Sequence, residues 1–212
     1  MNRSRASRSG NGAGMVRIIG GRWRGTRLPV ADVAGLRPSS DRVRETLFNW
    51  LQPWLSGARV LDLFAGSGAL GLEAVSRGAT QAVLVERDAQ LVQALHASVE
   101  RLQAGDTVQV IHADALAWLR APLFGQFDGV FLDPPFDAQL WPQVLPLLTP
   151  WLAPQAWLYL ESAADAPQPA GPDWLLHREG HTRHAHYALY RRSADAAATL
   201  GPSSKPSPDT CP

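Results

Sequence analysis

Cysteine and lysine each occur only once in this sequence. The single cysteine, Cys211, lies next to the end of the chain, which excludes a framework of disulfide bonds and a zinc site built from four thiolates. No run of eighteen apolar residues occurs, and the first fourteen residues contain no apolar segment of a secretory signal. We therefore expect a soluble protein that resides in a reducing, cytoplasmic compartment and binds no membrane.

Charged residues are also few, at 18% of the 212 residues, while hydrophobic residues at 45% lie in the range of folded proteins. The chain is long enough for one sizeable domain. Its net charge of +1 conceals an asymmetry, because residues 1–60 contain eleven arginines and three acids, whereas residues 61–175 contain four arginines and thirteen acids. The basic N-terminal region predicts a polyanionic partner, although a solvated arginine-rich surface explains the charge equally well.

The pattern along the chain predicts four segments. In order, they are a disordered basic arm, a basic hairpin and helix, a Rossmann-like domain and a disordered tail, over 1–14, 15–58, 59–192 and 193–212.

Within the second segment, residues 16–30 predict a β-hairpin with a turn at the pair of glycines that begins with Gly20. A helix follows, capped by Ser40 or Asp41 and ended or kinked by Pro53.

From residue 59 onward, short apolar runs alternate with helical patterns. The runs read RVLDLF, QAVLVE, VQVIH, FDGVFL and AWLYLE. Strands that are apolar throughout and are separated by helices indicate a parallel sheet covered on both faces. Two final runs, near 174–178 and 185–191, are close enough in sequence to be antiparallel. The sequence thus predicts an α/β, Rossmann-like sheet that is mostly parallel, with an antiparallel last strand and the small hairpin as an appendage.

The residues that follow these strands carry the functional signal, because an open parallel sheet binds ligands beyond the carboxyl ends of its strands. The first strand is followed by a glycine-rich turn, Gly66-x-Gly68-x-x-Gly71, and the second ends in Glu86. This arrangement is typical of a site for a nucleotide-like ligand, with Glu86 placed to contact ribose hydroxyls. The glycines alone do not distinguish a dinucleotide from S-adenosylmethionine.

Charge separates these two cofactors. A dinucleotide brings pyrophosphate to such a turn, whereas S-adenosylmethionine brings an ammonium, a carboxylate and a sulfonium. Asp62, at the end of the first strand, would repel pyrophosphate and attract an ammonium, so it favours S-adenosylmethionine. Asp114, after the third strand, either accepts a hydrogen bond from an adenine amino group or simply caps the short helix that follows it.

The fourth strand ends in Asp133-Pro134-Pro135-Phe136. Two prolines stop a strand, so a rigid turn is the plain structural explanation. The same group offers a carboxylate, a carbonyl of fixed direction and an aromatic face, which suit the methylation of an exocyclic amine. Such an amine is a weak nucleophile until two acceptors, here Asp133 and the Pro134 carbonyl, orient its N–H groups and offset the positive charge that develops. Phe136 would stack on the base, and this chemistry requires no metal.

With these motifs the sequence resembles the RsmD-type small-subunit ribosomal RNA guanine-N2 methyltransferases. The matching stretches are RIIGGRWRG, LRPSSDRVRETLFNWL, LDLFAGSGALGLEAVSRGA, VLVERD and FLDPPF, and the resemblance spans residues 16–192. Ser39 departs from the family pattern, where threonine is expected.

The resemblance implies a class I methyltransferase fold, S-adenosylmethionine as methyl donor, and the N2 amine of a guanine as acceptor. It also implies 16S ribosomal RNA, within the small ribosomal subunit, as the partner of a monomeric enzyme. The donor-site residues that we expect are Asp62, Phe64, Gly66, Ser67, Gly68, Glu86 and Asp114. The basic hairpin and helix would hold RNA phosphates through Arg22, Trp23, Arg24, Arg27 and Arg42.

Other readings remain at this point. The same acceptor geometry serves the exocyclic amine of adenine or cytosine in DNA. An NAD-dependent dehydrogenase fits the glycines but gives no role to Asp62 or to the two prolines. A nucleic-acid-binding module on an inactive Rossmann-like scaffold keeps the basic N-terminal region and predicts no methylated product. A metal site is not expected from the histidines near the last strand, which have no cysteine or clustered acids beside them, namely His177, His181, His184 and His186.

Overall fold

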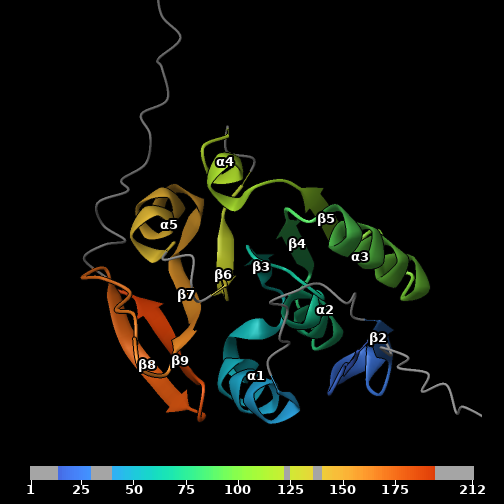
Figure 1. Cartoon of the computed structure of the whole chain (residues 1–212), viewed down its shortest axis with the longest axis horizontal. Helices are drawn as coiled ribbons and strands as arrows, with labels where there is room; N and C mark the ends of the chain where they lie inside the picture. The colour runs from blue at the N-terminus through green and yellow to red at the C-terminus, as the bar shows by residue number, and fades with distance from the viewer. Residues whose placement is uncertain (1–13, 30–39, 122–124, 136–139, 194–212) are drawn as a thin grey trace, which may run out of the picture.

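The computed structural model describes residues 14–29, 40–121, 125–135 and 140–193. Within them, a seven-stranded sheet with the order β5-β4-β3-β6-β7-β9-β8 has helices on both faces (Figure 1). The strands are β3 (Arg59–Asp62), β4 (Gln81–Glu86), β5 (Val108–His112), β6 (Phe127–Leu132), β7 (Leu152–Ala163), β8 (Trp174–His181) and β9 (Ala185–Arg192). The helices are α1 (Asp41–Leu55), α2 (Ala69–Ser76), α3 (Ala89–Arg101), α4 (Ala115–Leu119) and α5 (Trp141–Leu148), and α5 continues into a 3₁₀ turn, η3 (Thr149–Trp151).

The strand directions follow the expected pattern. Strands β5, β4, β3, β6 and β7 are parallel to one another, β9 is antiparallel to β7, and β8 is antiparallel to β9. A mostly parallel sheet with an antiparallel last strand is therefore confirmed. Because only three residues join β8 to β9, these two strands pair as a hairpin, which places β8 at the edge of the sheet.

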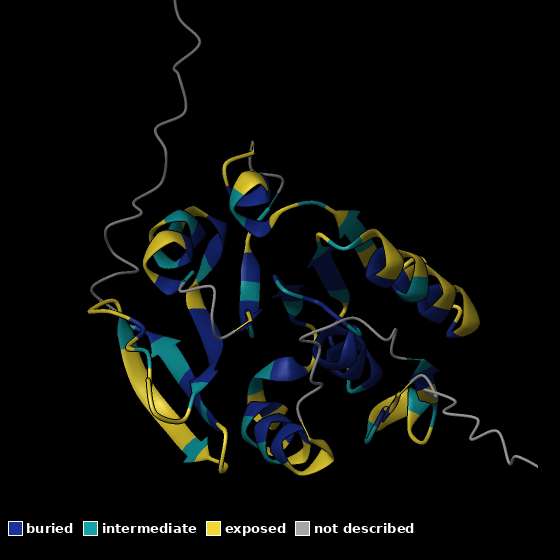
Figure 2. Cartoon of the chain, viewed as in Figure 1, coloured by how far each residue is buried: buried dark blue, intermediate teal, exposed yellow. Residues whose placement is uncertain are grey.

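Two hydrophobic clusters lie on the two faces of the sheet. Side chains of α1, α2 and α3 form the first cluster with one set of strand residues, and side chains of α4 and α5 form the second cluster with the alternate set. Val60 belongs to the first cluster and its neighbour Leu61 to the second, and both are fully buried. Because both faces are covered, the central strands are apolar at successive positions; Figure 2 shows them buried.

Helix α1 begins where the sequence predicts and ends later. The Ser40 hydroxyl accepts a hydrogen bond from the Val43 N–H and caps the helix. The helix then continues through Pro53 to Leu55, so of the two effects expected of Pro53 the end of the helix is wrong, and a kink stays a prediction. Pro53 removes only one backbone donor near the end of the helix, where buried Leu51 and Leu55 hold the last turn against the core. In the described part of the chain, no helix combines the length and apolar character needed to cross a membrane.

The N-terminal hairpin forms a separate two-stranded antiparallel sheet from β1 (Met15–Arg17) and β2 (Arg27–Pro29). This confirms the expected hairpin, but its connection is longer than a two-residue turn and contains a 3₁₀ turn, η1 (Gly21–Trp23). Gly21 has a φ of +74° and touches the last turn of α2 so closely that a Cβ would overlap the Ser76 carbonyl. The hairpin is thereby seated on α2. The boundary at residue 58 between this segment and the sheet domain stays a prediction.

Candidate active site

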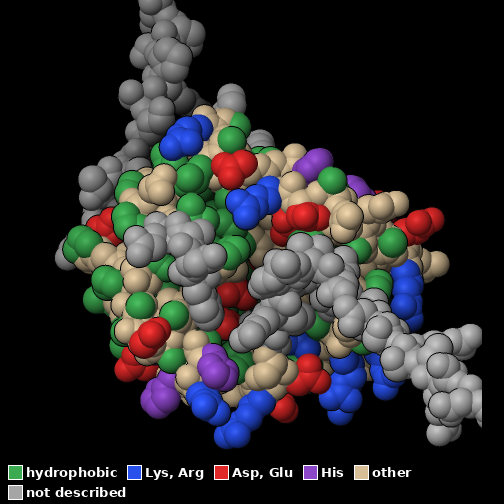
Figure 3. Space-filling model, viewed as in Figure 1, with side chains coloured by type: hydrophobic (Ala, Val, Ile, Leu, Met, Phe, Trp, Pro, Cys, Tyr) green, Lys and Arg blue, Asp and Glu red, His purple; other side chains and the backbone are tan. Residues whose placement is uncertain are grey.

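Acidic side chains gather at the carboxyl end of the sheet. Asp62 ends β3, Glu86 ends β4, Asp133 follows β6, and Glu161 lies near the end of β7. The space-filling view shows acidic side chains in a hollow near the middle of the molecule (Figure 3). Ligands of open parallel sheets usually bind beyond the carboxyl ends of the strands, at the point where the strand order reverses. In this sheet the order reverses at β3, the first strand of the sheet.

The turn between β3 and α2 takes the shape that its glycines allow. Gly66 and Gly68 have φ values of +52° and +73°, which side-chain-bearing residues rarely adopt. A Cβ on Gly68 would also lie 2.6 Å from a methyl group of Leu95 on α3. Phe64 and Ser67 are half-buried in the same turn. The glycines therefore allow a tight turn in which both are buried, and the contact of this turn with a ligand stays a prediction.

Asp62 is 2% exposed, and its carboxylate accepts a hydrogen bond from the Gly71 N–H at 3.0 Å. The bond satisfies one of the free N–H groups in the first turn of α2, whose preceding residue, Gly68, has no side chain to do so. Burial raises the pKa of Asp62 from 3.8 to about 7, against the lowering effect of the Gly71 bond, and the nearby charge of Glu86 raises it further. A buried acid with so high a pKa is suited to a cationic ligand group that would restore its charge.

Glu86 holds the glycine-rich turn in place. One of its carboxylate oxygens accepts from the Gly66 N–H at 2.8 Å, and the other accepts from the Asp88 N–H at 2.8 Å. Each carboxylate oxygen can accept a second hydrogen bond, so these two contacts are compatible with the predicted ribose contact. The contact itself stays a prediction.

Asp114 is exposed and caps α4, because its Oδ1 accepts from the Ala117 N–H at 3.0 Å. The capping role that the sequence offered as the plain alternative is thus present. A cap uses one oxygen, so an adenine contact through the same carboxylate is still a prediction.

At the tip of β6, Asp133 is half-buried and Pro134 is buried. Burial is the main cause that raises the pKa of Tyr159, and the charges of Glu161 and Asp133 add to it. Asp133 therefore lies within electrostatic reach of a buried tyrosine on the neighbouring strand. Phe136 lies outside the described residues, so its predicted stacking role is not addressed by the structure.

Two residues of this site, Tyr159 and Glu161, were not identified from the sequence. Glu161 is 7% exposed and accepts a hydrogen bond from the hydroxyl of the fully buried Tyr159 at 2.7 Å. Glu161 stands in the run AWLYLE, which reads as a single apolar strand. The rule that singled out Asp62 and Glu86, namely an acid at the end of a strand, would also have found Glu161.

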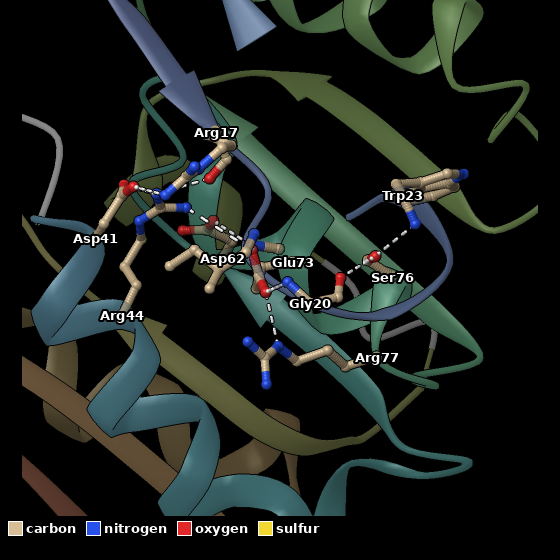
Figure 4. A network of polar contacts seen from close by, with 11 residues as sticks. Arg17, Gly20, Trp23, Asp41, Arg44, Asp62, Glu73, Ser76 and Arg77 are labelled. Atoms are coloured by element: carbon tan, nitrogen blue, oxygen red, sulfur yellow. Dashed lines mark hydrogen bonds and ion pairs between the residues drawn. The ribbon is translucent and has the colours of Figure 1, made fainter. Parts of the chain in front are cut away.

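A buried ionic network joins the hairpin to α1 and α2 (Figure 4). Glu73, which is fully buried on α2, accepts from the backbone N–H groups of Ile19 and Gly20 at 2.7 Å each, and from Arg77 at 2.6 Å. Arg44 is also fully buried. Its Nη1 lies 3.8 Å from Oε2 of Glu73, and its Nη2 donates to the Arg17 carbonyl at 2.8 Å. The sequence interpretation missed this network, because acids and arginines within amphipathic helices read as surface residues.

The predicted RNA contacts lie mostly on the surface of the hairpin. Arg22, Arg24 and Arg27 are exposed, as is Arg42 in the first turn of α1. Trp23 is half-buried and packs against the first hydrophobic cluster, with the guanidinium of Arg22 4.2 Å from the centroid of its ring. Trp23 therefore helps to anchor the hairpin, and its predicted contact with RNA is untested.

The fold and this site define a methyltransferase with a Rossmann-like sheet. The solved structure of a putative methyltransferase, yhhF from Escherichia coli, is 45% identical with a TM-score of 0.77 and covers 85% of this chain and 99% of that one. A putative methylase from Haemophilus influenzae is 40% identical with a TM-score of 0.73 and covers 84% of this chain and 99% of that one.

Curated relatives identify the particular family. The ribosomal RNA small subunit methyltransferase D of Escherichia coli K12 is 47% identical over 187 residues, which cover 87% of this chain and 93% of the relative. The Haemophilus influenzae protein of the same name is 43% identical and covers 85% of this chain and 96% of the relative. Residues 16–191 match the family described as "Conserved hypothetical protein 95". The chain belongs to this family of ribosomal RNA small subunit methyltransferase D proteins, which confirms the resemblance.

The residues at the carboxyl edge fit S-adenosylmethionine, the methyl donor of this class of enzyme. Asp62 is a buried carboxyl suited to an ammonium, the left-handed glycines form a tight turn beside it, and Glu86 keeps acceptor capacity. In the ranges that the structure describes, no group of three or more His, Cys, Asp or Glu side chains is placed to hold a metal ion.

Proposed function

We propose that this chain transfers a methyl group from S-adenosylmethionine to the N2 amine of a guanine in 16S ribosomal RNA, within the small ribosomal subunit. The observation that carries the proposal is the placement of Asp133 and Pro134 at the tip of β6, beside the strand that ends in Asp62. The family membership supports the same substrate class, because the relatives are named for the ribosomal RNA of the small subunit.

The donor would be held at the ends of β3, β4 and β5. Asp62 pairs with the ammonium of the donor, Glu86 accepts from the ribose hydroxyls, and Asp114 accepts from the adenine amino group. Phe64, Gly66, Ser67 and Gly68 line the turn. When bound, the donor supplies an activated methyl group on a sulfonium, so the protein contributes mainly alignment.

The acceptor amine would lie between the donor and β6. Its lone pair is delocalised into the guanine ring, so the amine attacks well only when its two N–H groups are oriented by acceptors. The Asp133 carboxylate and the Pro134 carbonyl are those acceptors, and the negative charge of Asp133 offsets the positive charge that develops on the nitrogen. A base in a helix cannot reach this point, so the guanine must be unstacked, with Phe136 as its stacking partner.

The RNA backbone would be held by the hairpin and α1. Arginine side chains pair well with phosphates and also steer a polyanion toward the site. The residues that we assign to this contact are Arg22, Trp23, Arg24, Arg27 and Arg42.

The test is radiolabelled methyl transfer to small ribosomal subunits that lack the modification, followed by digestion and identification of the labelled nucleoside. We expect N2-methylguanosine from the wild type. The variant Asp133→Ala should lose about 100-fold or more in rate while its affinity for S-adenosylhomocysteine stays within about twofold of the wild type. The control is Asp106→Ala, because Asp106 is exposed in the turn before β5.

Three results would contradict the proposal. A labelled adenine or cytosine derivative would show that another exocyclic amine is the acceptor. A wild-type rate in Asp133→Ala would remove Asp133 from the reaction, and absence of any labelled product in the wild type would favour a binding module without activity.

A further inference from the structure

Glu161 and Tyr159 form a buried polar pair that no step of the proposed reaction uses. Both side chains lie on the face of the sheet covered by α1, because Tyr159 belongs to the first hydrophobic cluster and alternate residues of a strand share a face. The Tyr159 hydroxyl donates to the Glu161 carboxylate at 2.7 Å. A carboxylate can accept about four hydrogen bonds, so this bond orients Glu161 without exhausting its capacity as an acceptor.

Strand register places Glu161 near Asp133. Phe131 pairs with Tyr159 and Leu132 pairs with Leu160. Asp133 is the first residue after β6, and Glu161 is the next residue of β7 after Leu160. Neighbouring strands lie about 4.8 Å apart, Phe131 at the end of β6 packs on Tyr159, and the charge of Asp133 acts on Tyr159, the hydrogen-bond partner of Glu161. The carboxylates of Asp133 and Glu161 thus both lie near Tyr159, at the end of β6 where the acceptor is proposed to bind.

The Watson–Crick edge of guanine has the complementary chemistry. It presents three adjacent N–H donors, two on N2 and one on N1. The edges of adenine and cytosine present only two, on the exocyclic amine, beside a ring nitrogen that is an acceptor. Asp133 and the Pro134 carbonyl account for two acceptors, and a third acceptor beside them matches guanine alone. A carboxylate that faces the lone pair of a ring nitrogen is repelled instead, and an unpaired buried acceptor is costly.

We propose that Glu161 is the specificity-determining residue of this site, which selects guanine by accepting a hydrogen bond from its N1–H while Tyr159 holds the carboxylate in place. This inference rests on the proposed function, because it assumes that the base enters at Asp133. It explains why the site accepts guanine and not another base with an exocyclic amine.

The experiment compares guanine with 2-aminopurine, which keeps the 2-amino group but has an unprotonated N1. Once the labelled position has been mapped, small subunits are reconstituted with 16S ribosomal RNA that carries either base at that position. The wild type should methylate the guanine about 100-fold faster than the 2-aminopurine. Glu161→Gln, whose amide can also donate a hydrogen bond, should methylate guanine about 10- to 100-fold more slowly and bring the ratio of the two rates close to one.

Controls distinguish specificity from folding. Glu161→Gln should bind S-adenosylhomocysteine as the wild type does, and Tyr159→Phe should lower the ratio less than Glu161→Gln. A wild type that methylates both bases equally overturns the inference, even if the Glu161 variant does not fold. An unchanged ratio in a folded Glu161→Gln variant overturns it as well. In either case N2-methylguanosine from the wild type would leave the proposed function standing, whereas the absence of this product would remove both.

Discussion

Replacement of Asp62 by asparagine should stabilise the protein and weaken its binding of the methyl donor. Burial raises the pKa of this carboxyl from 3.8 to about 7, so ionising it in the folded state costs more than in the unfolded chain. One pKa unit corresponds to 1.36 kcal/mol, and a shift of about three units therefore corresponds to about 4 kcal/mol. Asparagine has the same shape, and its amide oxygen can accept the Gly71 N–H.

The sign of the effect follows from proton binding. Between about pH 4 and pH 7 the folded protein keeps a proton on Asp62 that the unfolded chain has lost. The stability that comes from this extra proton is thus fully present below about pH 4 and decreases as the pH rises toward 7. Above about pH 7 it is lost, and the free energy of unfolding no longer changes through Asp62. Asp62→Asn removes this dependence. The variant should be more stable than the wild type by up to about 4 kcal/mol at pH 8, and the difference should shrink toward pH 4.

Denaturant unfolding of both proteins between pH 4 and pH 8 measures this difference in the free energy of unfolding. Any cost of burying the asparagine amide is the same at every pH, so it cancels when the differences at two pH values are compared. Affinity for S-adenosylhomocysteine should change in the opposite direction. Wild-type binding should weaken about tenfold per unit as the pH falls below 7, because the ammonium requires the ionised carboxylate, and binding by Asp62→Asn should be weak and flat. Stability curves that run parallel at all pH values would refute the reasoning.

Two further predictions concern the RNA contact and the donor turn. Reversal of Arg22 and Arg24 to glutamate should weaken RNA binding and reduce the slope of log K against log salt by about one to two, as measured by filter binding; Arg120→Glu, at the end of α4, should leave the slope unchanged. Gly71→Ala should destabilise the protein by about 1–3 kcal/mol in denaturant unfolding, because its Cβ would overlap buried Leu84. Gly105→Ala, which has nothing within 4 Å of the added Cβ, should be near neutral, and equal costs for the two glycine variants would contradict the steric argument.

The sheet could be predicted from the sequence because its signal is a local pattern of residues along the chain. Apolar runs of strand length between helical patterns leave few alternatives to a parallel sheet covered on both faces, and strand ends then locate Asp62, Glu86 and Asp133. The partners of these acids could not be predicted in the same way. Asp62 bonds Gly71 and Glu86 bonds Gly66, and such contacts depend on how a turn folds back in three dimensions. Glu161 ends the apolar run AWLYLE as Glu86 ends QAVLVE, so the sequence carried its signal, but its bond to Tyr159 depends on the folded strand.

The buried network around Glu73 gives a physical reason for three of the stretches that carry the family resemblance. The stretch RIIGGRWRG supplies the N–H groups of Ile19 and Gly20, the stretch LRPSSDRVRETLFNWL supplies Arg44, and Glu73 and Arg77 come from the stretch that also forms the glycine-rich turn. Sequence reasoning treats these stretches as separate signals, one for RNA and one for the donor.

In the structure the same stretches meet on α2. Asp62 bonds the first turn of this helix, and Glu73, in its middle, bonds the hairpin. A buried carboxylate among two arginines and two N–H donors contributes little net stability, yet removal of one partner is costly, so it favours a single arrangement of the parts. The position of the basic hairpin is therefore tied, through one short helix, to the turn where the donor is proposed to bind. An RNA segment held by the hairpin is thereby kept at a set distance from the methyl group that it is to receive.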